Sequence, residues 1–202
     1  AVYRPEHYHE KEILSPWSFG DTVCSYSYEG FEGKPIKAEI YSDAGEVELF
    51  LNGKSLGRKT ITDEDKMVAL YDFTYEPGEL KAVNYRDGVA CEEHTIRSAS
   101  GERKLIVELE SEKASLERND VIFVKVSVAD ADGIVYIQDK SRVKLTVEGP
   151  AELTGFANDD PCPNEDICDD TRTLYDGTAL AVVRPNGTGT VKITASAQGH
   201  AD

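Results

Sequence analysis

Hydrophobic and polar residues alternate with a period of two along most of this chain. The clearest runs are residues 36–40 and 47–51, where every second residue is aliphatic. Successive side chains of a β-strand point to opposite faces of the sheet, so this pattern predicts half-buried strands. Apolar residues at helical spacing are rare. We therefore expect an almost all-β protein.

Turn chemistry follows several of these runs. Asn52-Gly53 comes directly after the second run and predicts a type I′ hairpin that returns through residues 54–59. The string Tyr75-Glu76-Pro77-Gly78 predicts a turn between strands at residues 67–73 and 80–85, because Pro presets φ and Gly accepts positive φ. A short strand is expected at residues 89–91.

The apolar pattern lapses at residues 98–102, which are small and polar, as is typical of a linker between compact units. Strands resume beyond it at residues 105–109, 121–128, 143–147, 179–183 and 190–195, and Pro185-Asn186-Gly187-Thr188-Gly189 predicts a hairpin between the last two. Short strands separated by frequent turns favour immunoglobulin-like β-sandwiches. We expect two in tandem, at residues 16–99 and 102–202.

Charge narrows the classes of function. The 202 residues include 38 acidic and 22 basic ones, for a formal charge of -16. Such a surface repels nucleic acid and anionic membranes, so neither is an expected partner, and anionic substrates are disfavoured for the same reason. Neutral glycans remain candidate partners. The longest apolar stretch, residues 179–183, is too short to span a bilayer.

Several short stretches of the sequence resemble modules of a known protein family. Residues 41–59 (YSDAGEVELFLNGKSLGRK) and 75–83 (YEPGELKAV), followed by Arg86-Asp87-Gly88, resemble a module found behind the catalytic barrel of family 2 glycoside hydrolases, especially bacterial β-galactosidases. The opening Tyr3-Arg4-Pro5 and Ser15-Pro16-Trp17 resemble the passage that leaves that barrel. Residues 126–133, 147–151, 155–161 and 176–180 resemble the bacterial immunoglobulin-like domain that commonly follows.

The resemblance implies a fragment without a catalytic residue. Family 2 enzymes use two glutamates on a (β/α)₈ barrel, and a barrel takes about 250 residues of alternating strand and helix, which this chain lacks. On this interpretation residues 1–15 follow a catalytic barrel, and the preceding catalytic domain of the same polypeptide is the expected partner. The modules would stabilise the enzyme, shape its substrate site or assist assembly, in a bacterial cytoplasm or after export. The alternative is a stand-alone carbohydrate-binding or adhesive module.

One loop is strongly acidic. Residues 158–170 hold six carboxylates: Asp159, Asp160, Glu165, Asp166, Asp169 and Asp170. Oxygen ligands at this density are able to wrap Ca²⁺, although the spacing does not match an EF-hand loop. The sequence therefore leaves open a calcium site and a solvated acidic loop; no other cofactor is expected.

Cysteines and aromatic residues give further hypotheses. Cys162 and Cys168, in the acidic loop, are either a short-loop disulfide or free thiols. Cys24 and Cys91 fall in separate strand candidates, where buried cysteines commonly act as small apolar residues. Trp17, the only tryptophan, is either a sugar-stacking residue or a packed anchor.

The histidines of the opening segment form a weaker hypothesis. His7 and His9, with Glu6, Glu10 and Glu12, would be able to line up on one side of an extended segment as metal ligands. Nothing else in the sequence completes a coordination shell, so a polar segment is favoured.

Overall fold

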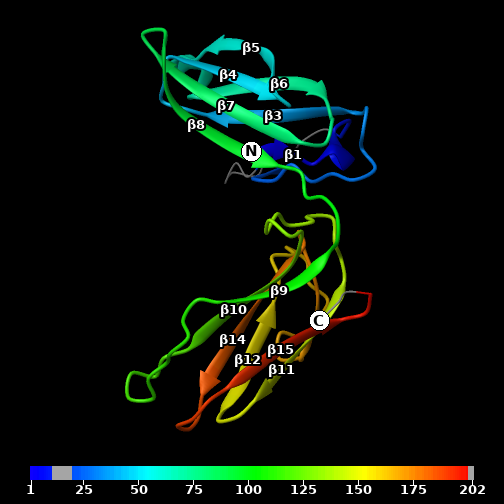
Figure 1. Ribbon diagram of the computed structural model, residues 1–202, viewed down its shortest axis with the longest axis vertical. Coiled ribbons are helices and arrows are strands. Elements are labelled where there is room, and N and C mark those ends of the chain that lie inside the picture. Colours follow the sequence, from blue (N-terminus) through cyan, green and yellow to red (C-terminus); the bar gives the residue numbers. More distant parts are fainter. Residues whose placement is uncertain (11–19, 200–202) are drawn as a thin grey trace. The chain divides into compact units, whose positions relative to one another are not determined.

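The computed structural model describes residues 1–10 and 20–199, and it is 50% strand and 3% helical. The chain divides into two compact units, Ala1–Ser98 and Ala99–Asp202. Each unit contains two antiparallel sheets (Figure 1). The predictions of an all-β fold and of two immunoglobulin-like sandwiches are confirmed.

The first unit is built from two four-stranded sheets. One sheet has the order β2 (Thr22–Val23), β1 (Val2–Tyr3), β3 (Pro35–Tyr41) and β6 (Val68–Thr74). The other has the order β5 (Lys54–Thr60), β4 (Glu46–Leu51), β7 (Glu79–Arg86) and β8 (Val89–Arg97). Two short 3₁₀ turns, η1 (Pro5–His7) and η2 (Asp63–Asp65), interrupt the strands.

Alternation explains the core of the first unit. Ile36 and Ala38 of β3 and Val47 of β4 are fully buried, whereas their strand neighbours face outward. Tyr71 of β6 joins the two sheets, because its hydroxyl donates hydrogen bonds to the carbonyl oxygens of Val47 (2.9 Å) and Gly57 (3.2 Å) in the opposite sheet. Burial raises the pKa of Tyr71 to about 12.

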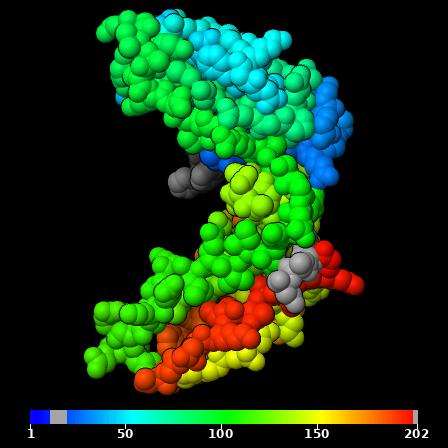
Figure 2. Space-filling model, in the orientation of Figure 1, coloured from blue at the N-terminus to red at the C-terminus, as the bar shows by residue number. Residues whose placement is uncertain are grey.

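The second unit packs a four-stranded sheet against a three-stranded one. The larger sheet has the order β12 (Ala151–Ala157), β14 (Thr178–Pro185), β10 (Ile122–Ala129) and β9 (Lys104–Leu109). The smaller has the order β13 (Thr171–Thr173), β11 (Arg142–Glu148) and β15 (Lys192–Ala197). The core lies between them and includes Val126, Ala181, Leu145 and Phe156. The edge strands β9 and β15 lie side by side on the surface of this unit (Figure 2).

The predicted hairpin at residues 185–189 is wrong. β14 pairs with β10 and β12, whereas β15 pairs with β11, so the segment crosses from one sheet to the other. The amide of Asn186 instead donates to the carbonyl of Pro150 at 3.0 Å. Crossing lets the apolar faces of β14 and β15 cover the same core from opposite sides.

Further strands differ from the expectation, and no residue range was predicted for the short strands β1, β2 and β13. β12 was not expected, because a bulge between Leu153 and Gly155 shifts its register and breaks the period of two. β8 runs from Val89 to Arg97 and not only over residues 89–91. It is an edge strand with mostly exposed side chains, so its polar sequence carries no hydrophobic alternation. Among the described residues, no helix is long and apolar enough to cross a membrane.

Candidate functional site

The acidic loop connects β12 to β13, and hydrogen bonds within the protein use several of its carboxylates. Asp160 Oδ1 accepts from the amide of Cys162, and Asp166 Oδ1 accepts from the amide of Cys168, each at 2.9 Å. Asp170 Oδ2 lies 3.3 Å from Lys144 Nζ. Among residues 1–10 and 20–199, no group of three or more His, Cys, Asp or Glu side chains is arranged to hold a metal ion. A calcium site formed by Asp159, Asp160, Glu165, Asp166, Asp169 and Asp170 therefore stays a prediction.

Arg172 organises this loop, and the sequence analysis did not identify it. Its side chain is 1% exposed, and Nη2 donates to the carbonyl of Asp166 at 2.6 Å. Nη1 lies 3.5 Å from Glu165 Oε2, while Nε has no hydrogen-bond partner. Arg172 and Leu174 share the inward face of this segment, and both are buried. In the sequence, Arg172 stands two positions before Leu174, so on a strand both side chains point to the same face. This spacing could have indicated that Arg172 is buried.

Glu165 is the acidic partner of this buried arginine. Its carboxylate accepts hydrogen bonds from the amide and the hydroxyl of Thr173, both at 3.0 Å. Burial favours the neutral acid, but the hydrogen bonds from Thr173 and the charge of Arg172 outweigh it, so the pKa of Glu165 lies below its usual range. The carboxylate therefore has a structural role in closing the loop onto β13.

The cysteines are free thiols in the structure. Cys162 and Cys168 are exposed and form no disulfide with each other. Cys24 and Cys91 are also free and exposed, so the expectation that they act as buried apolar residues is wrong. Cys91 lies on the exposed edge strand β8, which explains its accessibility. Trp17, the predicted sugar-stacking residue, lies outside the described residues, as does Glu12.

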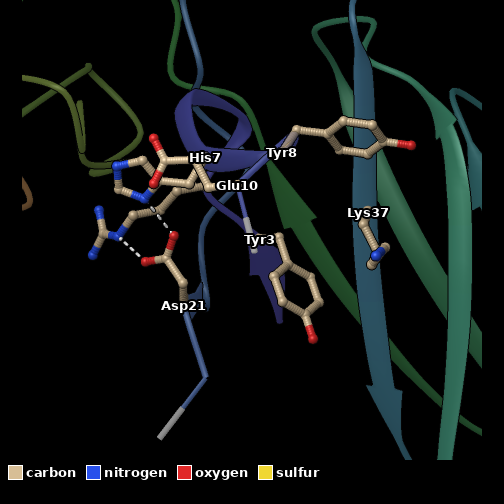
Figure 3. Close-up of a pocket in the computed structure, with 7 residues that line it drawn as sticks. Tyr3, His7, Tyr8, Glu10, Asp21 and Lys37 are labelled. Carbon is tan, nitrogen blue, oxygen red and sulfur yellow. Dashed lines mark hydrogen bonds and ion pairs between the residues drawn. The ribbon is translucent and has the colours of Figure 1, made fainter. Parts of the chain in front are cut away.

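A pocket of about 230 Å³ opens on the first unit beside β1 and η1 (Figure 3). β1 is anchored by pairing of Val2 with Val23 of β2 and Ala38 of β3. Pro5 fixes φ for the first position of η1, and this turn carries His7 and Tyr8 to the rim of the pocket. The described residues that line it are Tyr3, Arg4, His7, Tyr8, Glu10, Asp21 and Lys37.

One side of the pocket is an ionic cluster around Asp21. Arg4 Nε lies 3.0 Å from Asp21 Oδ1, and His7 Nδ1 lies 2.6 Å from Asp21 Oδ2 (Figure 3). The hydrogen bond to Asp21 raises the pKa of His7 against the opposing effect of burial, and the charges of Asp21, Glu10 and Glu6 raise it further. One carboxylate thus interacts with two basic side chains, Arg4 and His7.

The other side of the pocket is aromatic. Tyr3 and Lys37 are on the outer face of their sheet, because their neighbours Val2 and Ala38 are fully buried. Lys37 Nζ lies 5.3 Å from the ring centroid of Tyr3 and 6.0 Å from that of Tyr8. Pairing of β1 with β3 creates this arrangement from residues more than thirty positions apart in sequence, so sequence reasoning missed it. The pocket offers hydrogen-bond donors, one shared carboxylate and two aromatic rings, which is the chemistry of a binding site.

Comparison with known proteins identifies the modules. The fold defines a pair of immunoglobulin-like sandwiches of the kind appended to larger proteins. Residues 105–202 match the family model for glycoside hydrolase family 2 C-terminal domain 5, and residues 33–92 match a model for a domain of unknown function. Residues 105–202 therefore belong to a C-terminal domain family of glycoside hydrolase family 2, and the chain resembles the C-terminal modules of members of that family.

Individual relatives agree with this assignment. A β-galactosidase from Bacteroides ovatus is 31% identical over 160 residues, which are 79% of this chain and 19% of the relative. A putative β-glucuronidase from Formosa agariphila is 29% identical over 76% of this chain and 15% of its own length. A family 2 member from Bacteroides cellulosilyticus superposes with a TM-score of 0.89 at 29% identity, over 99% of this chain and 26% of that one. The chain spans less than a fifth of the first two relatives.

Proposed function

We propose that this chain is the non-catalytic C-terminal portion of a glycoside hydrolase, in which it stabilises the catalytic domain and shapes its substrate site or its assembly. The observation that carries the proposal is the superposition of nearly the whole chain on about a quarter of a family 2 member. The described residues form two sandwiches and no (β/α)₈ barrel, so bond cleavage is assigned to the preceding domain of the same polypeptide.

We infer that the parent enzyme cleaves O-glycosyl bonds and is of the β-galactosidase type. The B. ovatus β-galactosidase supports this, with 31% identity against 29% and 26% for two β-glucuronidase relatives from F. agariphila. Aryl β-galactoside and aryl β-glucuronide assays of the parent protein distinguish the two. Turnover of the glucuronide alone would reject the β-galactosidase assignment.

The accessory role is tested by deletion. The 202-residue chain alone is expected to give no turnover of either aryl glycoside, and turnover that survives repurification would overturn the proposal. The parent protein without residues 1–202 is expected to melt at a lower temperature or to show a changed KM. A truncated parent with unchanged melting temperature, KM, kcat and oligomeric state would contradict the accessory role.

A further inference from the structure

We propose that the pocket beside β1 and η1 binds an acidic saccharide, with a sugar ring against Tyr3 and Tyr8 and a sugar carboxylate paired with Lys37 (Figure 3). This site goes beyond the accessory role, and it does not depend on the activity of a parent enzyme. The assignment rests on three observations: Lys37 forms no ion pair with a described carboxylate, hydrogen bonds restrain the two tyrosine rings, and basic residues are frequent in the pocket lining.

Lys37 carries an ammonium group that forms no ion pair with a described carboxylate. Its contacts among the described residues are with the rings of Tyr3 and Tyr8, at 5.3 and 6.0 Å. Asp72 is the residue opposite Lys37 on β6 and its carboxylate accepts a hydrogen bond from the hydroxyl of Tyr8 at 3.4 Å, but it does not form an ion pair with Lys37. The pocket therefore presents a cation ready to pair with an anionic group of a ligand.

The two aromatic rings are held before any ligand arrives. The hydroxyl of Tyr3 donates to a carboxylate oxygen of Glu39, and that of Tyr8 donates to Asp72. Ordering a side chain on binding costs about 0.5–1.5 kcal/mol, and restraint in the free protein reduces this cost. The restrained rings offer apolar faces suited to the C–H face of a pyranose, while neighbouring polar groups are available to its hydroxyls.

The size of the pocket indicates a small ligand. Its volume of about 230 Å³ lies below the range of about 300–1,000 Å³ typical of sites for drug-sized ligands. A single sugar residue, or the end of a longer glycan, suits this volume better than an extended oligosaccharide.

Basic residues make up a larger share of the pocket lining than of the whole chain. The chain carries a formal charge of -16, whereas the described lining residues include three basic ones, Arg4, His7 and Lys37, and two acidic ones, Asp21 and Glu10. The carboxylates of Glu39 and Asp72 lie beside the pocket, because they accept hydrogen bonds from Tyr3 and Tyr8. Charges farther away than about 8 Å are largely screened at physiological ionic strength. Most of the negative charge of the chain is therefore screened from this site, whereas the carboxylates of Asp72 and Glu39 are close enough to oppose an anionic ligand.

Two matched sugars test the proposal on the full 202-residue chain. Methyl β-D-glucuronide and methyl β-D-glucoside differ only in a carboxylate in place of a hydroxymethyl group. We expect NMR titration with the glucuronide to shift signals of Tyr3, Tyr8 and Lys37, with an affinity about fivefold higher than for the glucoside, the upper end for a partly exposed ion pair. Raising the salt concentration should reduce this preference.

Substitutions test which side chains bind the sugar and which one causes the preference for the glucuronide. Lys37→Met should make the two sugars bind equally, and Tyr8→Leu should weaken both. Lys34→Met is the matched control, because Lys34 Nζ also lies over an aromatic ring, 4.4 Å from the centroid of Phe31, but does not line the pocket. Equal binding of the two sugars to the unaltered chain, shifts confined to other residues, or an equal effect of the two lysine substitutions would each overturn the proposal. Unchanged amide spectra of the variants exclude misfolding as the cause.

Discussion

The side chain of Asn52 lies so close to Gly78 that a β-carbon at position 78 would be 2.0 Å from Asn52 Oδ1. The same oxygen accepts a hydrogen bond from the amide of Glu79 at 2.8 Å, and Asn52 Nδ2 donates to the carbonyl of Pro77 at 3.2 Å. The hairpin turn after β4 is therefore joined to the turn that leads into β7. Both turns were predicted from local chemistry, but their contact was not.

This contact predicts that Gly78→Ala destabilises the first unit by about 2–3 kcal/mol, through backbone strain and the clash with Asn52. Gly78 has φ of 135°, a conformation that residues with a β-carbon rarely adopt. Urea titration followed by amide signals of β4 and β7 reports on this unit by itself.

The substitution Asn52→Gly separates the two causes of this destabilisation, which are the backbone strain at position 78 and the clash with Asn52. Asn52 has φ of 50°, so glycine fits the turn while removing the obstructing oxygen. The cost of Gly78→Ala should fall in the Asn52→Gly background, because only the strain at position 78 remains. Strictly additive costs would show that the close approach contributes nothing.

Local turns and alternation are predictable from this sequence because they depend on neighbouring residues. Asn52 and Gly53 both have positive φ in the structure, as the hairpin assignment requires. The partners of β14 and β15 were not predictable in the same way, because each strand pairs with residues far away in sequence. The bulge at Leu153 also conceals β12, since its buried residues are out of phase with a period of two.

The candidate sites also depend on contacts between residues far apart in sequence, which the sequence alone does not predict. The acidic loop was recognised from composition, but the role of Glu165 depends on Arg172, which is buried only once β13 joins the sheet. The pocket likewise requires Tyr3 and Lys37 to meet through pairing of β1 with β3. Composition identifies a charged segment, whereas the fold decides which charges are paired.

Loss of the buried guanidinium should destabilise the second unit. Arg172→Met leaves the Asp166 carbonyl without its donor and the Glu165 carboxylate without its cationic partner, and we expect a cost of about 2–4 kcal/mol for breaking this largely buried pair. Lys144→Met removes the exposed partner of Asp170 and should cost at most about 1 kcal/mol. Urea titration followed by amide signals of β11 and β13 compares the two variants.

A second substitution tests the pairing itself. If Glu165 and Arg172 stabilise each other, Glu165→Gln should cost less in the Arg172→Met background than in the unaltered protein. Equal costs in both backgrounds would assign the effect of Arg172 to its packing and its hydrogen bond with Asp166, and not to Glu165.

Thiol chemistry should reveal four accessible cysteines. Cys24, Cys91, Cys162 and Cys168 are all free and exposed, so a thiol reagent is expected to label four groups on the native chain without reductant. A disulfide between Cys162 and Cys168 would leave two. Mass spectrometry of the labelled chain, with a reduced and denatured sample as the reference for four, distinguishes the results.

Acid should weaken the second unit through Asp130. This side chain is 4% exposed, and it accepts hydrogen bonds from the amides of Ser100, Asp132 and Ile134, each at 2.9 Å. Burial raises the pKa of Asp130, but the backbone donors outweigh burial and hold the pKa below its usual value.

Because the pKa is lower in the folded than in the unfolded chain, the ionised carboxylate stabilises the fold above the unfolded value of about 3.9. This contribution is lost as the pH falls through the folded pKa. Asp130→Asn should therefore be less stable than the unaltered protein at pH 7, by about 2 kcal/mol for buried donors that lose a charged acceptor. The difference should shrink as the pH falls below about 3.9.

The neighbouring Asp132→Asn provides the matched control. Only the backbone amide of Asp132 contacts Asp130, and its own side chain is exposed, so this substitution should leave stability nearly unchanged from pH 7 to pH 3. Urea titrations across this range, followed by amide signals of β10, measure both variants. A deficit of Asp130→Asn that stays constant down to pH 3 would mean that the shape of the side chain, and not its charge, holds the segment around Ser100 and Ile134.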